Sequence, residues 1–199
     1  MGIFRNRGLT DEQKRRIPPG QHHVSDFPVL HVGEVPYTEV PPGWDLRVYG
    51  RVASPLRLDH AELRALPSAG VVCDIHCVTT WSKLDTRWEG VPMSWVLETV
   101  QPQPTATHVI AHAEEGYTAN VPVEALHDPN AMLAYRYDGA ELAPEHGGPL
   151  RLLLPRLYLW KSAKWLRALE FVDADAPGYW ERLGYSNTAD PWKEERYAF

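Results

Sequence analysis

The chain has 199 residues, a formal net charge of −6 at pH 7 and an apolar fraction of 44%. This length supports one well-buried domain. The acidic balance disfavours a general nucleic-acid binder, which normally carries a basic surplus or a basic stripe. No apolar stretch approaches the ~20 residues needed to cross a bilayer, and the first residues contain no apolar signal core. We therefore expect a cytoplasmic protein without a membrane span.

The N-terminal part of the sequence indicates an arm followed by an extended segment. Residues 1–25 combine several basic side chains with few large apolar ones, which is typical of an exposed arm. Between residues 27 and 37, Pro28 and Pro36 favour an extended segment laid across the core rather than a helix. We therefore place the start of the folded domain at residue 26.

The next elements are short. Residues 46–52 predict a strand, and residues 60–66 predict a helix with Asp59 as its N-cap. Residues 71–78 are rich in β-branched side chains and predict a second strand. Residues 92–100 predict a helix that begins with a proline, and another proline two positions beyond its end prevents its continuation.

Strands dominate the rest of the chain. The predicted strands cover residues 107–113, 118–123, 132–137, 150–155 and 166–172. Asp138 and Gly139 predict a hairpin turn. Because strands and short helices mix without a regular βαβ order, the sequence favours an α+β fold over a doubly wound sheet.

Residues 177–199 are rich in aromatic side chains, which is unusual for a solvated tail. We expect this segment to pack back on a domain that covers residues 26–176. The simpler interpretation is that the segment only covers the surface of the domain, because large aromatic side chains bury area wherever they lie. A lid over a functional site is the alternative.

The two cysteines, Cys73 and Cys77, lie in one predicted strand. Four strand steps separate their α-carbons by roughly 13 Å, about twice what a disulfide bridges, so they are not partners. The simplest account is that both thiols fill the core. Cys77, however, stands where the apolar run ends, and a thiolate there is a soft ligand suited to a metal or to a nucleophilic role.

A basic segment without acidic residues covers residues 146–169. Its cations are Arg151, Arg156, Lys161, Lys164 and Arg167. In a chain that is acidic overall, this segregation indicates an anion site, in which Ser162 and the two lysines hold a phosphate and the glycines at 147 and 148 let the backbone approach it. A solvated basic face of a strand is the alternative.

A thiolate and a distant anion-binding segment together fit a cofactor that has a soft metal at one end and a phosphate at the other. The chain offers no Gly-rich dinucleotide turn, Walker loop or iron–sulfur cysteine set. Five motifs follow one another in the order FPVLHVGEVP, HCVTTWS, EGYTANVP, AYRYDGAELAPEHGGPLRLLLP and WKSAKW. With them the sequence resembles the molybdopterin-binding domain of the sulfite oxidase family, in the small bacterial and archaeal branch that includes methionine sulfoxide reductase catalytic subunits.

This resemblance implies a fold of mixed sheets with short helices, and it assigns roles to individual positions. Cys77 matches the cysteine whose sulfur binds molybdenum. The positions matched to pterin and phosphate contacts are His31, His146, Arg151, Ser162, Ala163 and Lys164. Lys161 joins this predicted cofactor-binding set because of its charge. The region of His112 and Ala113 is also expected to approach the cofactor.

The predicted function is oxygen-atom transfer by a molybdenum–molybdopterin oxidoreductase on a small S-oxide, N-oxide or sulfur oxyanion. A separate electron-transfer protein is the expected partner, because the sequence has no haem, flavin or iron–sulfur motif.

The sulfite-binding arginines of animal sulfite oxidases do not align, and the nearest basic residue after Cys77 is Lys83. A non-catalytic cofactor carrier or anion-binding module is the alternative. A cysteine hydrolase is disfavoured because no His and acid pair accompanies the cysteine.

Overall fold

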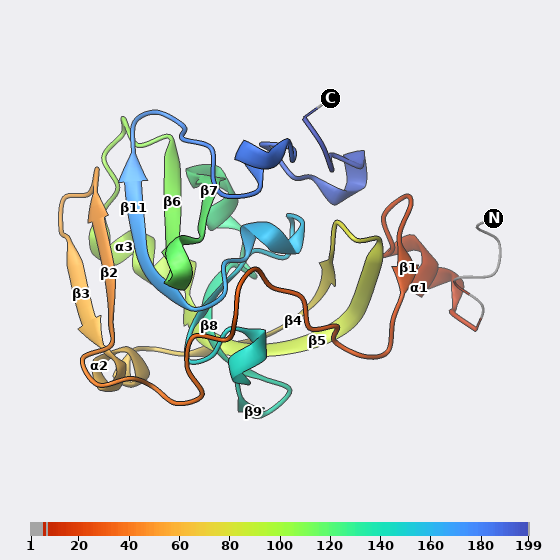
Figure 1. The fold of residues 1–199 in the computed structure, drawn as a ribbon, viewed down its shortest axis with the longest axis horizontal. Coiled ribbons are helices and arrows are strands. Elements are labelled where there is room, and N and C mark those ends of the chain that lie inside the picture. The colour runs from red at the N-terminus through yellow and green to blue at the C-terminus, as the bar shows by residue number, and fades with distance from the viewer. Residues whose placement is uncertain (1–5, 7, 199) are drawn as a thin grey trace.

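The computed structural model describes residue 6 and residues 8–198, which form two mixed sheets and three short α-helices (Figure 1). The six-stranded sheet contains β1 (His22–His23), β4 (Ala69–His76), β5 (Trp81–Pro92), β8 (Met132–Tyr137), β9 (Ala140–Glu141) and β10 (Arg151–Leu153). The five-stranded sheet contains β2 (Asp45–Gly50), β3 (Leu56–Asp59), β6 (His108–Ala113), β7 (Thr118–Pro122) and β11 (Leu166–Val172). The helices are α1 (Asp11–Arg15), α2 (His60–Ala65) and α3 (Met93–Val100). The predicted α+β fold of mixed sheets with short helices is confirmed.

The two sheets share one large apolar core. In the five-stranded sheet the order is β3-β2-β11-β6-β7, and only β2 and β11 run parallel. Val48 and Leu169 of this sheet belong to the same buried cluster as Val96 of α3 and Leu133 of β8. Figure 1 shows the β4–β5 hairpin reaching away from the five-stranded sheet toward α1 and β1. Cys73 and Cys77 lie in a second, smaller cluster along this hairpin.

The longest strand, β5, was not predicted from the sequence. Its charged side chains alternate with buried ones, so that Leu84, Thr86 and Trp88 face inward while Asp85 and Arg87 are exposed. This is the two-residue period of a half-buried strand. The strand also pairs with three neighbours, β1, β4 and β8. It is therefore the centre of the six-stranded sheet.

The N-terminal arm is packed against this sheet rather than fully exposed. Thr10 and Gln13 form a capping box at the start of α1. Arg16 donates hydrogen bonds to the carboxylates of Asp74 on β4 and Asp85 on β5, and Ile17 is buried. The part of the predicted arm at residues 1–5 and 7, and the last residue of the predicted aromatic segment, lie outside the described residues. Within the described chain, no helix is long and apolar enough to cross a membrane.

Candidate active site

A cavity of about 310 Å³ opens beside the end of β4. Its walls come from segments far apart in the sequence: the extended stretch 27–32, the loop 77–81, the turn 114–117, the basic segment 151–165 and the C-terminal stretch 179–185. Six of the eight predicted site residues line it, namely His31, Cys77, Arg151, Ser162, Ala163 and Lys164. The fold therefore brings the predicted metal ligand and the predicted anion-binding segment into one cavity.

Cys77 follows β4 directly and differs from Cys73 in its surroundings. Thr79 Oγ1 donates a hydrogen bond to Cys77 Sγ at 3.2 Å. Burial raises the pKa of the Cys77 thiol, and the bond from Thr79 together with the charges of Arg196 and Lys164 opposes that rise. Cys73 does not line the cavity, and burial raises its pKa to about 12. Both thiols are free, as predicted, and Cys77 is the one that the cavity exposes to a ligand.

Arg151, at the start of β10, places a guanidinium in the interior, where no acidic side chain among the described residues pairs with it. Its side chain is 2% exposed. Nη1 donates to the carbonyl of His146 at 2.9 Å and Nη2 to that of Ser162 at 3.0 Å, while Nε has no hydrogen-bond partner among the described residues. Burial lowers the pKa of Arg151 to about 10. A buried, charged donor with a spare N–H fits an anionic ligand.

Lys164 adds a second cation to the same wall. Its Nζ donates to the carbonyl of Glu145 at 2.6 Å. Burial, and then repulsion from Arg151, lower the pKa of Lys164 to about 7. Gly147, which has a φ of +110°, makes this arrangement possible, because a Cβ there would stand 2.9 Å from the Cβ of Lys164. Gly147 thus lets Lys164 pack closely against the backbone at residue 147. The sequence had instead predicted that a ligand would approach the backbone there.

Ser162 and Ala163 position the backbone of the same turn. Ser162 Oγ accepts a hydrogen bond from the amide of Leu154, and the Ala163 carbonyl accepts one from the amide of Leu152. Both residues are buried. They fasten the cation-bearing turn to β10, so that Arg151 and Lys164 stay on one wall.

The two predicted pterin-contacting histidines lie differently. His31 lines the cavity, and its Nδ1 lies 3.0 Å from the carbonyl of Gly33. His146 does not line it. Its ring stacks on Phe27, which does, with the ring centres 4.0 Å apart. Burial and the charges of Lys164 and Arg151 lower the pKa of His146 to about 4, which keeps this ring neutral.

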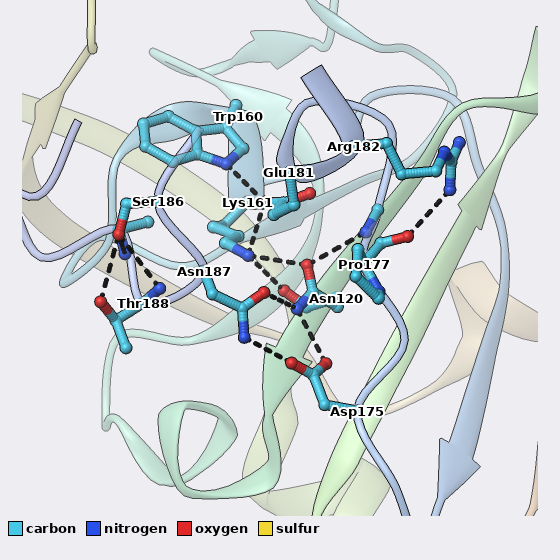
Figure 2. Close-up of polar contacts among 12 residues, drawn as sticks. Asn120, Trp160, Lys161, Asp175, Pro177, Glu181, Arg182, Ser186, Asn187 and Thr188 are labelled. Atoms are coloured by element: carbon cyan, nitrogen blue, oxygen red, sulfur yellow. Dashed lines mark hydrogen bonds and ion pairs between the residues drawn. The ribbon is translucent and has the colours of Figure 1, made fainter. Parts of the chain in front are cut away.

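Lys161 and His112 form contacts outside the cavity. Lys161 Nζ donates to both oxygens of Asn120, at 2.8 and 2.9 Å, and pairs with Glu181 at 2.6 Å (Figure 2). His112 Nε2 lies 2.8 Å from a carboxylate oxygen of Glu170. Neither residue lines the cavity. Composition cannot separate Lys161 from Lys164, because only the turn between them decides which ammonium faces the cavity.

Aromatic side chains form much of the cavity wall, and the sequence did not assign them to the site. They include Trp81, Tyr117, Trp160, Trp165, Tyr179, Trp180 and Tyr185. The last three belong to the C-terminal segment, whose aromatic richness was the available signal. Lys83 lies outside the cavity lining and donates to the carbonyl of Ser25.

Cys77 has no cluster of further metal-ligating side chains around it in the part of the chain that the structure describes. Among residues 6 and 8–198, no group of three or more His, Cys, Asp or Glu side chains could hold a metal ion. A metal at Cys77 would therefore need further ligands from a cofactor, and a dithiolene-bearing pterin provides soft sulfur ligands of this kind.

Comparison with known proteins identifies the class. The model of the oxidoreductase molybdopterin binding domain family matches residues 32–180. The chain belongs to this family, whose extent includes Cys77, Arg151 and Lys164. The solved structure of the sulfane dehydrogenase SoxCD from Paracoccus pantotrophus shares the fold, with a TM-score of 0.60 and 20% identity over 92% of this chain and 57% of that one.

Individual relatives refine the comparison. An uncharacterized oxidoreductase, YuiH of Bacillus subtilis, is 45% identical over 188 residues, which are 94% of this chain and 95% of that protein. The catalytic subunit MsrP of a protein-methionine-sulfoxide reductase from Gluconobacter oxydans is 28% identical over 70% of this chain and 50% of its own length. A putative subunit, YedZ1, from Azospira oryzae is 34% identical over 71% of this chain and 53% of its own length. The chain spans about half the length of these last two relatives.

Proposed function

We propose that this chain is a molybdenum–molybdopterin oxidoreductase that transfers an oxygen atom to or from a small S-oxide, N-oxide or sulfur oxyanion. One observation carries the proposal: a single cavity holds the thiol of Cys77 together with two cations, the buried Arg151 and the partly buried Lys164, that have no ion-pair partner among the described residues. A buried cation without a counter-ion is costly unless a bound anion compensates it. The family match supports a pterin cofactor as that anion.

In this proposal, the residues on each wall of the cavity have a binding or catalytic role. Arg151, Lys164 and the backbone around Ser162 would hold the phosphate end, with His31 beside the pterin, and Cys77 would bind the metal. When bound, the cofactor supplies a redox metal that exchanges an oxygen atom and two electrons with the substrate. Thr79 tunes the thiolate through its hydrogen bond to Sγ. The aromatic walls exclude water from the reacting atoms.

The reaction balances only with an external electron carrier. In the reducing direction, the bond between oxygen and the substrate sulfur or nitrogen breaks, the oxygen takes two protons and leaves as water, and two electrons are consumed. A separate electron-transfer protein, or a reduced dye in its place, supplies these electrons. In the oxidising direction, water gives the oxygen atom and the carrier removes the electrons.

Replacing each cysteine in turn tests the proposal. Cys77→Ser is expected to lower turnover with reduced viologen and a panel of S-oxides and N-oxides by more than about 100-fold. Loss of a hydrogen bond to a metal ligand lowers metal affinity or activity by about 10–100-fold, and loss of the ligand itself is expected to lower activity further. Cys73→Ser, the matched control four residues earlier on β4 and outside the cavity lining, is expected to retain activity. Undiminished turnover by Cys77→Ser would contradict a catalytic role for Cys77. A wild-type protein that binds the cofactor but turns over no substrate would favour the carrier alternative.

A further inference from the structure

The turn that carries Cys77 contains a strained residue. β4 ends at His76 and β5 begins at Trp81, so residues 77–80 connect the two strands. The amide of Thr80 donates to the carbonyl of Cys77 at 3.0 Å, and the amide of Cys77 donates to the carbonyl of Trp81 at 2.8 Å. Thr80 has a φ of +78°, which is unfavourable for a β-branched side chain. Such a conformation persists only where surrounding contacts hold it, and residues of this kind cluster at functional sites.

The N-terminal arm bonds directly to this turn. Nε2 of Gln21 donates to the carbonyl of Cys77 at 3.1 Å, and Gln21 is 7% exposed. The amide of the next residue, His22, donates to the carbonyl of Thr80 at 2.8 Å, where the parallel pairing of β1 with β5 begins. The carbonyl groups of the first and last residues of the turn therefore both accept hydrogen bonds from the arm.

The C-terminal segment, residues 177–198, contacts the same turn. Arg196 Nη1 donates to the carbonyl of Val78 at 2.7 Å. Among the described residues this is the only hydrogen bond of the guanidinium, since Nη2 lies 3.8 Å from Glu194 Oε1 and has no hydrogen-bond partner. The side chain is 14% exposed, and its Cζ lies over the ring of Tyr158, 5.1 Å from the ring centre. Arg196 therefore directs its one hydrogen bond at the residue that follows the thiol.

The arm and the C-terminal segment also contact each other beside the turn. Gly20, which has a φ of +69°, permits this contact, because a Cβ there would overlap Glu194 Oε1 and stand 3.1 Å from Arg196 Nη2. Figure 1 shows β1 and the C-terminal segment near the end of the β4–β5 hairpin. Gln21 and Arg196 both lie outside residues 32–180, which the family model matches. These contacts to the turn thus come from parts of the chain beyond the family domain.

We propose that Gln21 and Arg196 are positioning residues for Cys77, which hold the turn at residues 77–80 in the conformation that directs the thiol into the cavity. The inference rests on the proposed function, in which Cys77 binds the metal. Hydrogen bonds around a metal ligand commonly fix its orientation, and a ligand on a strained turn needs such partners. Neither residue lines the cavity, so both act through the carbonyl groups of Cys77 and Val78.

The first test measures hydrogen exchange in cofactor-free protein. Gln21→Met and Arg196→Met each remove one bond to the turn, and we expect its two bonded amides to exchange about 10-fold faster, the effect of one lost hydrogen bond. The peptide that covers residues 77–81 reports this change. Arg196→Lys keeps a donor and is expected to retain much of the protection. Arg182→Met is the matched control, because Arg182 donates only to a carbonyl of its own segment.

Two outcomes of this test would overturn the proposal. One is exchange at the wild-type rate in the turn of either folded variant. The other is an equal acceleration across all strands, which would show a general loss of stability without a specific role at the turn. Gln21→Asn, which shortens the side chain by one methylene, replaces Gln21→Met if that variant does not fold. Because the measurement needs no molybdenum, its failure is distinguishable from failure of the proposed function.

The second test uses cofactor-loaded protein. Gln21→Met is expected to lower kcat about 10-fold and to shift the thiolate-to-metal absorption band, because the orientation of the ligand changes. The KM and the molybdenum content are expected to stay near the wild type, since Arg151 and Lys164 still hold the phosphate end. A wild-type kcat, or a rise in KM at unchanged kcat, would overturn the positioning role.

Discussion

Lys164 is the residue whose charge depends most on what fills the cavity. Its pKa is lowered from 10.5 to about 7 by burial and by Arg151, while Glu145 and Cys77 act in the opposite direction. In the cofactor-free protein this ammonium is half protonated near neutral pH. A bound phosphate would stabilise the charged form and raise the pKa again.

This shift predicts a pH-dependent stability for the cofactor-free protein. Between about pH 7 and 10.5 the unfolded chain binds more protons at Lys164 than the folded chain, so the free energy of unfolding rises with pH there, and the full penalty applies below pH 7. We expect Lys164→Met to raise the Tm relative to the wild type at pH 6, and the gain to shrink by pH 9, when measured by calorimetry. Burial also raises the pKa of the Cys77 thiol, which opposes its ionisation.

Lys193→Met, which alters an exposed lysine, is the control for this measurement and is expected to show no such trend. A gain in Tm that is the same at pH 6 and pH 9 would contradict a depressed pKa for Lys164. In cofactor-loaded protein the trend is expected to disappear, because the phosphate restores the charge.

Single residues also mark the limit of what the sequence predicted about the site. Cys77 was predicted from its place at the end of an apolar run, and Arg151 and Lys164 from a basic segment without acids. Lys161 belongs to the same segment, yet its ammonium pairs with Glu181 and does not line the cavity. Which lysine faces the cavity depends on the turn at Ser162, and a charge pattern does not contain that turn.

Among the elements, β1 and the end of α1 show how the N-terminal arm joins the domain. Arg16 Nη2 lies 2.5 Å from Asp74 on β4 and 2.6 Å from Asp85 on β5, and the strands β1 and β5 pair in parallel. Arg16 therefore clamps the middle of the β4–β5 hairpin, at whose end Cys77 stands.

Arg16→Ala is expected to lower the free energy of unfolding by about 1 kcal/mol, the upper end for a partly exposed ion pair, because two carboxylates lose their common partner. Urea denaturation measures this change. The neighbouring Arg15→Ala, at an exposed position, is expected to stay within about 0.5 kcal/mol of the wild type. Equal stabilities of the two variants would show that the arm does not stabilise the hairpin.

The pattern of predicted and missed elements has a physical reason. Strands made mostly of apolar residues, such as β6 and β11, and helices with strong boundaries, such as α2 with its Asp59 cap, were predicted correctly. β5 was missed because its charged residues hide a two-residue alternation, and its burial comes from three neighbouring strands. The capping-box residues of α1 were present in the sequence, but the basic residues around them led to the prediction of an exposed arm instead of a helix.

At the scale of the whole molecule, the cavity exists only because distant segments converge. The thiol comes from the β4–β5 hairpin, the cations from β10 and the stretch before β11, and the rings of Tyr179, Trp180 and Tyr185 from the C-terminal segment. Individual motifs could be predicted to carry a metal ligand or an anion site. That they face one another depends on strand pairing far along the chain, which local patterns do not encode.

The relatives differ in how much of their length this chain matches. The chain matches about half of the length of the MsrP proteins and nearly all of YuiH from Bacillus subtilis. Cys77, Arg151 and Lys164 line one cavity within this chain, so cofactor binding can be tested on this chain by itself.

The most direct test is the molybdenum and pterin content of the protein purified from a host that makes the cofactor. We expect about one molybdenum atom and one pterin per chain, and neither in protein from a host blocked in cofactor synthesis. Folded protein from the competent host that carries no molybdenum and no pterin would contradict the claim that the Cys77 cavity is a molybdopterin site.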